Sequence, residues 1–241
     1  MGNLRILFIG VAALFLSGCA TYSENSMIDH NDPWQTVNRP VFAMNDAFDQ
    51  VLFKPLAKTY DAVVPEPIQD GVTNFFSNLN EIDNAINNLI QGKPEKFATS
   101  VGRLAINSTL GFAGLFDVAS HIGLTHAPED LGQTFGTYGA NAGPYIVLPI
   151  IGSSSVRDVP GRILSMYLNP LAWLDDVSFR NIMVGVNAVD ARSNLLAKED
   201  IASEISNDKY TLYKDAFLEE RAFEISDGNL DDSDLTSDIA E

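Results

Sequence analysis

Hydrophobic residues recur at helical spacing along most of the chain, and alternating strand patterns are scarce. The clearest stripe is formed by Ile68, Val72, Phe75, Phe76 and Leu79, which are spaced as i, i+4, i+7, i+8 and i+11. Similar stripes predict further helices over residues 37–52, 82–90, 97–105, 179–196 and 210–223. The pattern therefore predicts an all-α body with a glycine-rich irregular segment near its middle.

Several residues mark the expected ends of these helices. Asp32 and Pro33 are placed as an N-cap and a proline at the first helical position. Pro55 is expected to end or kink the first helix, because the residue before a proline is pushed out of the helical region. Gly92 suits a C-cap, and Pro94 is expected to start the next helix.

The segment from Gly136 to Asp158, GTYGANAGPYIVLPIIGSSSVRD, breaks the helical pattern. Residues 145–151 form the one run that is compatible with a strand, and Pro149 makes a strand there doubtful because proline cannot donate to a ladder. Ser154 and Asp158 are expected to start a helix, with the serine capping free amides. The glycines allow close approach of the backbone or positive φ.

The first residues have the features of an export signal. Arg5 gives a basic start, and residues 6–16 form an apolar run that is shorter than the roughly 20 residues of a membrane span. Leu16-Ser17-Gly18-Cys19 then looks like a bacterial lipobox, in which the cysteine is lipidated and becomes the mature N-terminus. The alternative is a plain signal peptide with an incidental cysteine. Ala20, in place of a retention aspartate, favours the outer membrane.

Charge narrows the range of partners. The formal net charge is −17, and loss of Arg5 with residues 1–18 makes it −18. Such an acidic chain is not expected to bind nucleic acid or to dock on anionic lipid through a basic patch. Because no apolar run after Cys19 reaches spanning length, membrane contact must be apolar and lateral. We expect a lipidated N-terminus and tether over 19–31, a folded domain over 32–225, and an acidic disordered tail over 226–241.

The sequence offers little for catalysis or for cofactors. A phosphate loop needs a lysine after its glycines, and residues 97–197 contain no lysine. Ser153, Ser154 and Ser155 are not followed by the glycine of a nucleophile elbow. There is no metal-binding motif and no cysteine beyond Cys19. We expect no cofactor, no metal site and no enzymatic activity, while a serine–histidine–aspartate set assembled by the fold, as in an envelope lipase, stays open.

Nine short stretches along the body form a specific set. They are Asp32-Pro-Trp-Gln-Thr-Val-Asn-Arg39, Asn74-Phe-Phe-Ser-Asn-Leu79, Leu89-Ile-Gln-Gly92, Asn107-Ser-Thr-Leu-Gly111 with Phe116-Asp-Val118, Asp130-Leu-Gly-Gln-Thr-Phe-Gly136, Gly143-Pro-Tyr-Ile-Val-Leu-Pro149 with Arg157-Asp158, and Tyr213-Lys-Asp-Ala-Phe-Leu-Glu-Glu-Arg221. With this set, which spans about residues 32 to 225, the chain resembles the MlaA/VacJ family of outer-membrane lipoproteins.

The resemblance implies a ring-like, single helical domain that lies in the periplasmic leaflet of a Gram-negative outer membrane and surrounds an amphipathic channel. It implies that phospholipids mislocalised to the outer leaflet are removed and passed to a soluble periplasmic carrier protein for retrograde transport, which maintains lipid asymmetry. It also implies binding to trimeric porins and no catalysis. A structural lipoprotein that scaffolds porins without moving lipid is the alternative.

Two sets of residues are candidates for contact with lipid. One set is hypothesised to shape a wall or rim of the lipid path, with simple packing as the alternative: Gly136, Tyr138, Gly139, Gly143, Pro144 and Tyr145. The other set is proposed for head-group contact, because guanidinium forks match phosphate: Arg103, Arg157 and Arg162. For these arginines the alternative is ion pairing with neighbours such as Asp158.

Overall fold

Residues 32–199, 206 and 208–229 are described by the structure, which is a computed structural model. The expected signal peptide, the lipidation site at Cys19, the tether before Asp32 and residues 230–241 of the expected tail lie outside the described residues.

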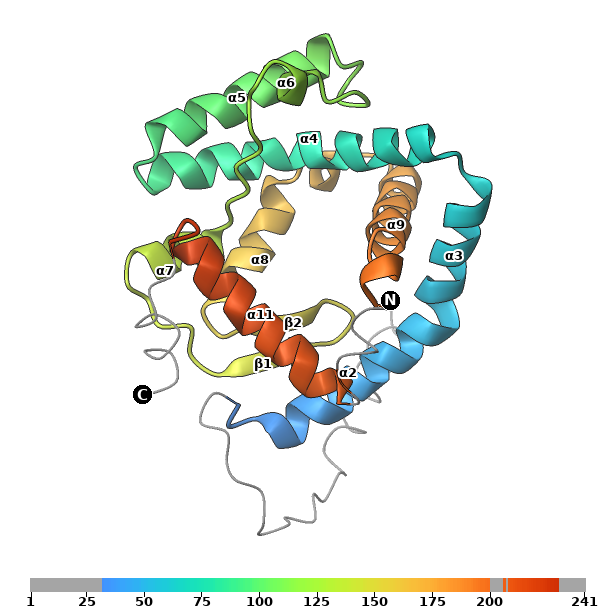
Figure 1. The fold of residues 1–241 in the computed structure, drawn as a ribbon, viewed down its shortest axis with the longest axis vertical. Coiled ribbons are helices and arrows are strands. Elements are labelled where there is room, and N and C mark those ends of the chain that lie inside the picture. Colours follow the sequence, from blue (N-terminus) through green and yellow to red (C-terminus); the bar gives the residue numbers. More distant parts are fainter. Residues whose placement is uncertain (1–31, 200–205, 207, 230–241) are drawn as a thin grey trace.

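Most of the helices form the sides of a ring (Figure 1). Its first half consists of α2 (Gln35–Phe48), a π-helical turn η1 (Asp49–Phe53), α3 (Lys54–Val63) and the long α4 (Glu66–Ile90). The outer side of α4 is covered by α5 (Pro94–Thr109), with the short α6 (Val118–His121) at its end. The other half consists of α7 (Leu131–Thr137), the strands β1 (Tyr145–Leu148) and β2 (Gly152–Ser155), and α11 (Lys209–Ile225).

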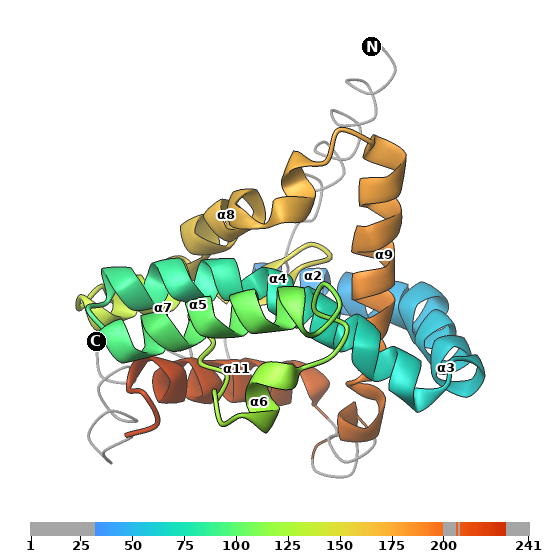
Figure 2. The ribbon, with the colours of Figure 1, turned by 90° about the horizontal axis from the view of Figure 1, so that it is seen from above.

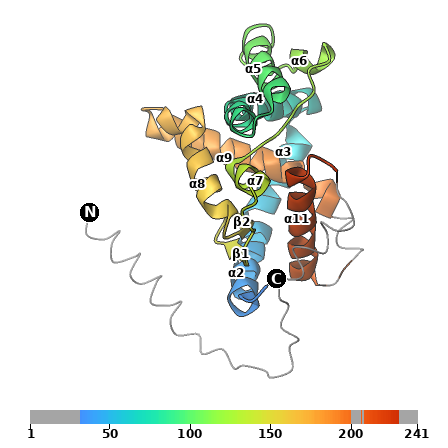
Figure 3. The same ribbon diagram turned by 90° about the vertical axis from the view of Figure 1, so that its left-hand side faces the viewer.

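Three consecutive elements leave this ring on one face. They are α8 (Asp158–Leu168), a 3₁₀ turn η2 (Pro170–Trp173) and α9 (Val177–Ser193). We call residues 158–193 the arch, because α8 slopes away from the ring and meets the steep α9 at an apex (Figure 2). The arch packs on α7 at its α8 end and on α3 and α4 through α9. In side view the arch and α11 lie on opposite faces of the ring (Figure 3).

The predicted N-cap at Asp32 is wrong. α2 begins at Gln35 after Trp34, and no side chain caps it. Asp32 is instead almost fully buried, and its carboxylate accepts hydrogen bonds from Asn38 Nδ2 at 2.8 Å and from the Tyr210 hydroxyl. The carboxylate joins α2 to α11, so it is not available to the free amides of the first turn.

The boundary at Pro55 is a distortion of a continuous helical path. The π-helical turn η1 comes directly before Pro55, which occupies the first turn of α3 and lacks the N–H that a regular α-helix would use at this position. The next boundary is confirmed. Gly92 has a φ of 73° just after α4, its N–H donates to Leu89 O at 3.1 Å, and α5 begins at Pro94.

The doubt about a strand after Pro144 was wrong. β1 and β2 form an antiparallel hairpin in which Tyr145 pairs with Ser155 and Leu148 with Gly152. Pro149 falls in the turn beyond the last pair, so the ladder does not need its missing N–H.

The expected helix cap at Ser154 was also wrong. Ser154 is a buried residue of β2, whereas Ser155 Oγ accepts the Asp158 N–H at 3.2 Å at the start of α8. The capping serine is therefore Ser155, one residue after the serine that the sequence favoured.

The described part of the acidic C-terminal region continues past α11 and contacts the body. The Asp227 carboxylate accepts from the ammonium groups of Lys93 and Lys96, each at 2.6 Å. Lys93 directly precedes α5 and Lys96 lies in its first turn, so these ion pairs connect the segment after α11 to the start of α5.

Burial in this molecule is inverted relative to a water-soluble domain. Among the described residues, the buried hydrophobic side chains are few and include several alanines, and they are outnumbered by buried polar or charged ones. Along α4, Ile68, Leu89 and Ile90 are exposed. Four asparagines of the same helix are buried: Asn78, Asn84, Asn87 and Asn88. Since soluble proteins rarely expose large contiguous apolar surface, this distribution indicates a molecule shaped for apolar surroundings.

Candidate functional site

A buried polar network holds α4, α5 and the following loop together. Arg103 Nε donates to Glu81 Oε1 at 2.5 Å, and its Nη2 donates to Asp117 Oδ2 at 3.1 Å. His126 Nδ1 lies 2.8 Å from the same Glu81 oxygen. Burial opposes ionisation of Glu81, but hydrogen bonds from His126 and Arg103 outweigh it and lower the pKa of that carboxyl.

A second network joins α7, α8 and α11 at the root of the arch. Arg221 donates to Asp130 at 2.8 Å and to Asp158 at 3.2 Å, and Arg157 donates to Asp158 at 2.9 Å. Burial works against a charged Asp158, yet the two arginines lower its pKa. The backbones of α7 and α8 approach so closely here that a Cβ on Gly161 of α8 would lie 2.7 Å from the backbone nitrogen of Gly132 in α7.

The far end of the arch is held by a third polar group. Tyr60 and Thr73 donate to the two oxygens of Asp190 at 2.9 and 2.7 Å, which ties α9 to α3 and α4. Arg192 Nε donates to Asp49 Oδ1 at 2.8 Å, which ties α9 to η1. Both ends of the arch are therefore fixed by polar side chains.

Between these two fixed ends the arch presents apolar side chains outward. The exposed fraction reaches 74% for Trp173 and 62% for Ile182. In the first half of α9, from Val177 to Val186, most residues are exposed and most of the exposed side chains are apolar, although Ser178, Arg180 and Asn181 are polar. The other exposed apolar residues of the arch are Ile163, Leu164, Met166, Tyr167, Val177, Phe179, Val184 and Val186. This much exposed apolar surface in one region is expected to face an apolar environment.

The described helices do not include one that is both long and apolar enough to cross a membrane.

The glycines of the central segment have different roles. A Cβ on Gly136 would lie 2.7 Å from Ile225 Cδ1, so this glycine permits α7 to pack on α11. Gly139 has a φ of +84° with open space around the missing Cβ, and Gly143 has a φ of +66° with Val156 Cβ 3.3 Å from its missing Cβ. Gly139 alone of the three therefore combines a left-handed backbone with free space at its surface.

The neighbouring residues of this set are placed differently from one another. Tyr138 is exposed, and its hydroxyl donates to Ile90 O at 2.5 Å, which ties the segment to the end of α4. Pro144 is half-buried beside the hairpin. Tyr145 is fully buried and packs with Tyr210 and Phe217 in the small apolar core. The structure thus gives Tyr145 a core position and Tyr138 a surface position.

The three candidate arginines also separate. Arg103 and Arg157 are engaged in the ion pairs described above, which is the alternative considered for them. Arg162 is half-buried on α8 with its guanidinium carbon 5.9 Å from the centre of the Phe217 ring. Within the described residues its side chain has no hydrogen bond or ion pair. Burial, and then the charge of Arg221, lower its pKa.

The serines of β2 do not form a hydrolase-like arrangement with a histidine among the described residues. Ser153 Oγ shares a hydrogen bond of 2.7 Å with the Tyr145 hydroxyl, and Ser154 Oγ is buried without a partner. His121 and His126 bond to Asp117 O and to Glu81 instead. The described part of the chain also contains no group of three or more His, Cys, Asp or Glu residues placed to hold a metal ion.

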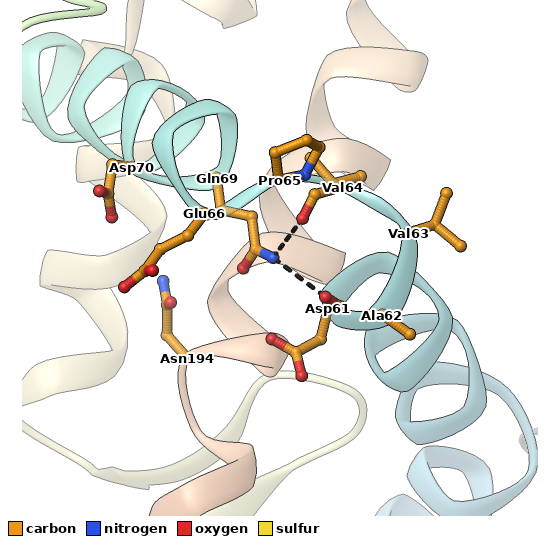
Figure 4. A pocket seen from close by; sticks show the side chains of 9 residues that line it. All are labelled: Asp61, Ala62, Val63, Val64, Pro65, Glu66, Gln69, Asp70 and Asn194. Atoms are coloured by element: carbon orange, nitrogen blue, oxygen red, sulfur yellow. Dashed lines mark hydrogen bonds between the residues drawn. The ribbon is translucent and has the colours of Figure 1, made fainter.

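An open depression of about 610 Å³ lies at the corner between α3 and α4. Figure 4 shows the carboxylates of Asp61, Glu66 and Asp70 around it, together with Asn194 from the end of α9. Gln69 Nε2 donates to two backbone carbonyls and so fixes the turn. Because its charged lining is acidic only, this depression is unsuited to the phosphate of a lipid.

The sequence patterns did not single out the apolar surface of the arch. Its signal is the high density of apolar residues between Ile163 and Val186, which a search for one-sided stripes assigns simply to helix.

The geometry defines a class of protein: a ring-shaped all-α protein with a polar interior and an apolar arch on one face. The model of the MlaA lipoprotein family matches residues 30–224, and the chain belongs to this family. This confirms the resemblance and the all-α fold.

The similar proteins come from several bacteria. The intermembrane phospholipid transport system lipoprotein MlaA of Haemophilus influenzae is 31% identical over 97% of this chain and 95% of that protein. The protein of the same name from Escherichia coli K12 is 29% identical over 95% and 91%. A Rickettsia bellii protein without an assigned function is 33% identical over 92% of each chain.

A solved structure is similar as well. It comes from work on the structural basis for maintenance of bacterial outer membrane lipid asymmetry, and it matches with a TM-score of 0.71 and 29% identity over 80% of this chain and 98% of that chain.

Proposed function

We propose that this chain is an outer-membrane lipoprotein that extracts mislocalised phospholipids from the outer leaflet and passes them to a soluble periplasmic carrier. The ring lies flat in the inner leaflet, anchored through acyl chains on Cys19, and a trimeric porin is its membrane partner. This movement of lipid maintains the asymmetry of the outer membrane. The names of the Haemophilus and Escherichia relatives support phospholipid transport, and the similar solved structure, which comes from work on outer membrane lipid asymmetry, supports the membrane concerned.

The observation that carries the proposal is the apolar arch between two polar ends. In water the exposed side chains of Ile182 and Trp173 would each forfeit about 1.5–3 kcal/mol that burial provides. Acyl chains supply that burial without a protein partner. A porin scaffold that moves no lipid would need apolar surface on its outer rim only, so an arch on the face of the ring favours transport.

A phospholipid needs a route with one apolar and one polar side. In the proposed path, acyl chains follow the arch, while the phosphate passes Arg162, whose guanidinium donors lack a protein acceptor among the described residues. Gly139 and Gly143 are proposed to shape the rim of this path, together with Tyr138 and Pro144. Gly136 and Tyr145 support that rim from within, through α11 and the core.

The decisive test measures phospholipid in the outer leaflet of a deletion strain complemented with this gene. Deletion is expected to accumulate outer-leaflet phospholipid and to cause sensitivity to SDS with EDTA, and complementation restores both. An intact lipid barrier in the deletion strain would contradict transport and leave the scaffold role.

The anchor is tested separately with Cys19→Ala. The variant is expected to be released from the membrane and to fail in complementation, because three acyl chains provide stable attachment that a lateral apolar surface alone does not. Full complementation by a soluble form would refute the anchor.

The rim is tested at Gly139. Gly139→Trp adds bulk into open space on a left-handed backbone that strains residues with a Cβ, so Gly139→Ala, which carries this strain with little bulk, is the control. We expect both proteins to fold and only the tryptophan variant to lose transport. Equal transport by the two variants would remove Gly139 from the mechanism.

A further inference from the structure

The arch carries three kinds of side chain in a fixed order. Nearest the ring, α9 is packed by polar groups such as Asp190. Its next ten residues, 177–186, are mostly exposed and mostly apolar. At the apex, which we define as residues 173–176, an exposed tryptophan is followed by the exposed acids Asp175 and Asp176.

This order matches the layers of a lipid leaflet. Tryptophan concentrates at membrane–water interfaces, where its ring is apolar on one side and its N–H faces polar groups. Charged groups are costly in hydrocarbon and lie in the head-group layer or in water. Asp176 accepts the N–H groups of Ser178 and Phe179 at 2.9 and 3.0 Å, and it caps α9 at the point where the polar layer would begin.

Trp173 is held in place. Its indole Nε1 donates to Tyr167 O at 2.8 Å, so the ring is fixed against the end of α8. Tyr167 is itself exposed, so a second aromatic residue of the interfacial type belongs to the same part of the arch. Arg180 lies one turn into α9, and its long side chain can extend toward the same polar layer.

The height of the apolar part fits a single leaflet. Residues 177–186 of α9 rise about 15 Å at roughly 1.5 Å per residue, which is about half of the ~30 Å hydrocarbon core. α8 slopes less steeply, and Asn169 at its end still lies 3.4 Å from Asn80 on α4. The steep part of the arch is therefore α9, which carries the apex away from the ring (Figure 2).

We propose that the arch crosses the leaflet opposite the one that holds the ring, so that its apex lies in the far interfacial layer. The occupant of the apolar surface of the arch is phospholipid acyl chain, and the head groups of that leaflet surround residues 173–176. This inference rests on the proposed function, which places the ring in the inner leaflet. The arch then gives a protein without a spanning helix among its described residues direct contact with lipid of the outer leaflet.

Depth-dependent fluorescence quenching tests the position of the apex. The chain contains two tryptophans, so Trp34→Phe leaves Trp173 as the single reporter. The full-length protein is reconstituted in phosphatidylcholine vesicles whose acyl chains carry bromine either near the head group or near the chain end. The expected result is a larger loss of Trp173 fluorescence with bromine near the head group.

A matched reporter sits lower on the same helix. Ile182→Trp in the Trp34→Phe, Trp173→Phe background replaces an exposed side chain, so folding is preserved. Its fluorescence is expected to fall more with bromine near the chain end, the reverse of the order for Trp173. Trp173 that is unquenched, or quenched most by the deep bromine, overturns the proposal, as does an unquenched Trp at position 182.

A rim reporter separates failure of this inference from failure of the proposed function. Val51 on η1 is 80% exposed, and Val51→Trp in the background without other tryptophans reports on the ring itself. Quenching at position 51 without quenching at the arch means that the ring is embedded and only the arch inference fails. Absence of quenching at every position contradicts the embedding on which the proposed function also depends.

Discussion

The ring and the arch of this molecule differ in which side chains they bury and which they expose. In the ring, side chains such as Glu81, Arg103 and Asn87 are buried and satisfied by hydrogen bonds across helices. In the arch, side chains such as Ile182 and Trp173 are exposed, and polar contacts are concentrated at its two ends and its apex. Buried polar contacts hold the ring together, whereas exposed apolar side chains distinguish the arch.

The contrast teaches how shape and environment are specified separately. Buried charges are costly when one partner is missing, so a satisfied network permits only one arrangement of the helices that carry it. Apolar side chains are non-directional and fix no arrangement, but they determine which solvent the surface can meet. Four experiments compare the two regions directly, from the largest expected effect to the smallest.

Removing a buried arginine from the ring has the largest expected effect. Arg103→Met leaves Glu81 and Asp117 without their shared cation, and we expect the free energy of unfolding in detergent to fall by about 3–5 kcal/mol. Arg180→Met on the arch is the control and should change it by less than about 0.5 kcal/mol. Chemical denaturation followed by circular dichroism measures both, and equal effects would contradict the contrast.

Glycine substitutions give the next largest difference. Gly161→Ala puts a Cβ 2.7 Å from a backbone nitrogen of α7 and is expected to destabilise by about 1–3 kcal/mol. Gly185→Ala on α9 meets nothing within 4 Å and should stabilise by about 0.5–1 kcal/mol, because alanine favours helix. Thermal unfolding midpoints should therefore move in opposite directions, and a shift of the same sign would break the comparison.

Acid should weaken the ring through Asp158. Its pKa is lowered in the folded protein, because Arg221 and Arg157 outweigh the effect of burial. The carboxylate therefore stabilises the fold fully above its ordinary pKa of 3.8, and this stability is lost as pH falls below that value. Asp158→Asn should flatten the dependence of stability on pH in this window, while Asp175→Asn at the apex should follow the original protein. If Asp158→Asn left the dependence of stability on pH unchanged, the ion pairs of Asp158 would not contribute to it.

A polar substitution on the arch should affect stability least. Ile182→Asn replaces a side chain that is 62% exposed, so the free energy of unfolding in detergent should change by less than about 0.5 kcal/mol. Transport in the complemented deletion strain should nevertheless fall, because an amide is unfavourable among acyl chains. Normal outer-leaflet lipid with this variant would show that the exposed surface of α9 is not used.

Much of the helical layout could be predicted from the sequence. The stripe that starts at Ile68 became α4, Gly92 ended it, and Pro94 began α5, because these signals act within a few residues of the chain. The errors at Asp32 and Ser154 have the opposite origin. Each was assigned to a local cap, while its actual environment is set by a distant element, α11 for the first and the paired strand β1 for the second.

The candidate site was predictable only in part. The sequence singled out Gly139 and Arg162, but it could not separate them from Gly136 and Arg103, which have the same chemistry. What separates them is tertiary: Ile225 lies against Gly136 and Glu81 against Arg103, from elements more than twenty residues away in the chain.

By itself the sequence determined the helices, the acidic charge and the family to which the chain belongs, because spacing, composition and short motifs are local properties. Tertiary structure decided which side of each helix is hidden. The asparagines of α4 turn inward because they find partners there, as Asn87 does in Thr134. The apolar residues of α9 remain outside because none of the described elements covers them. An amphipathic stripe shows that a helix has two faces, and only the neighbours that it meets decide which face is the inside.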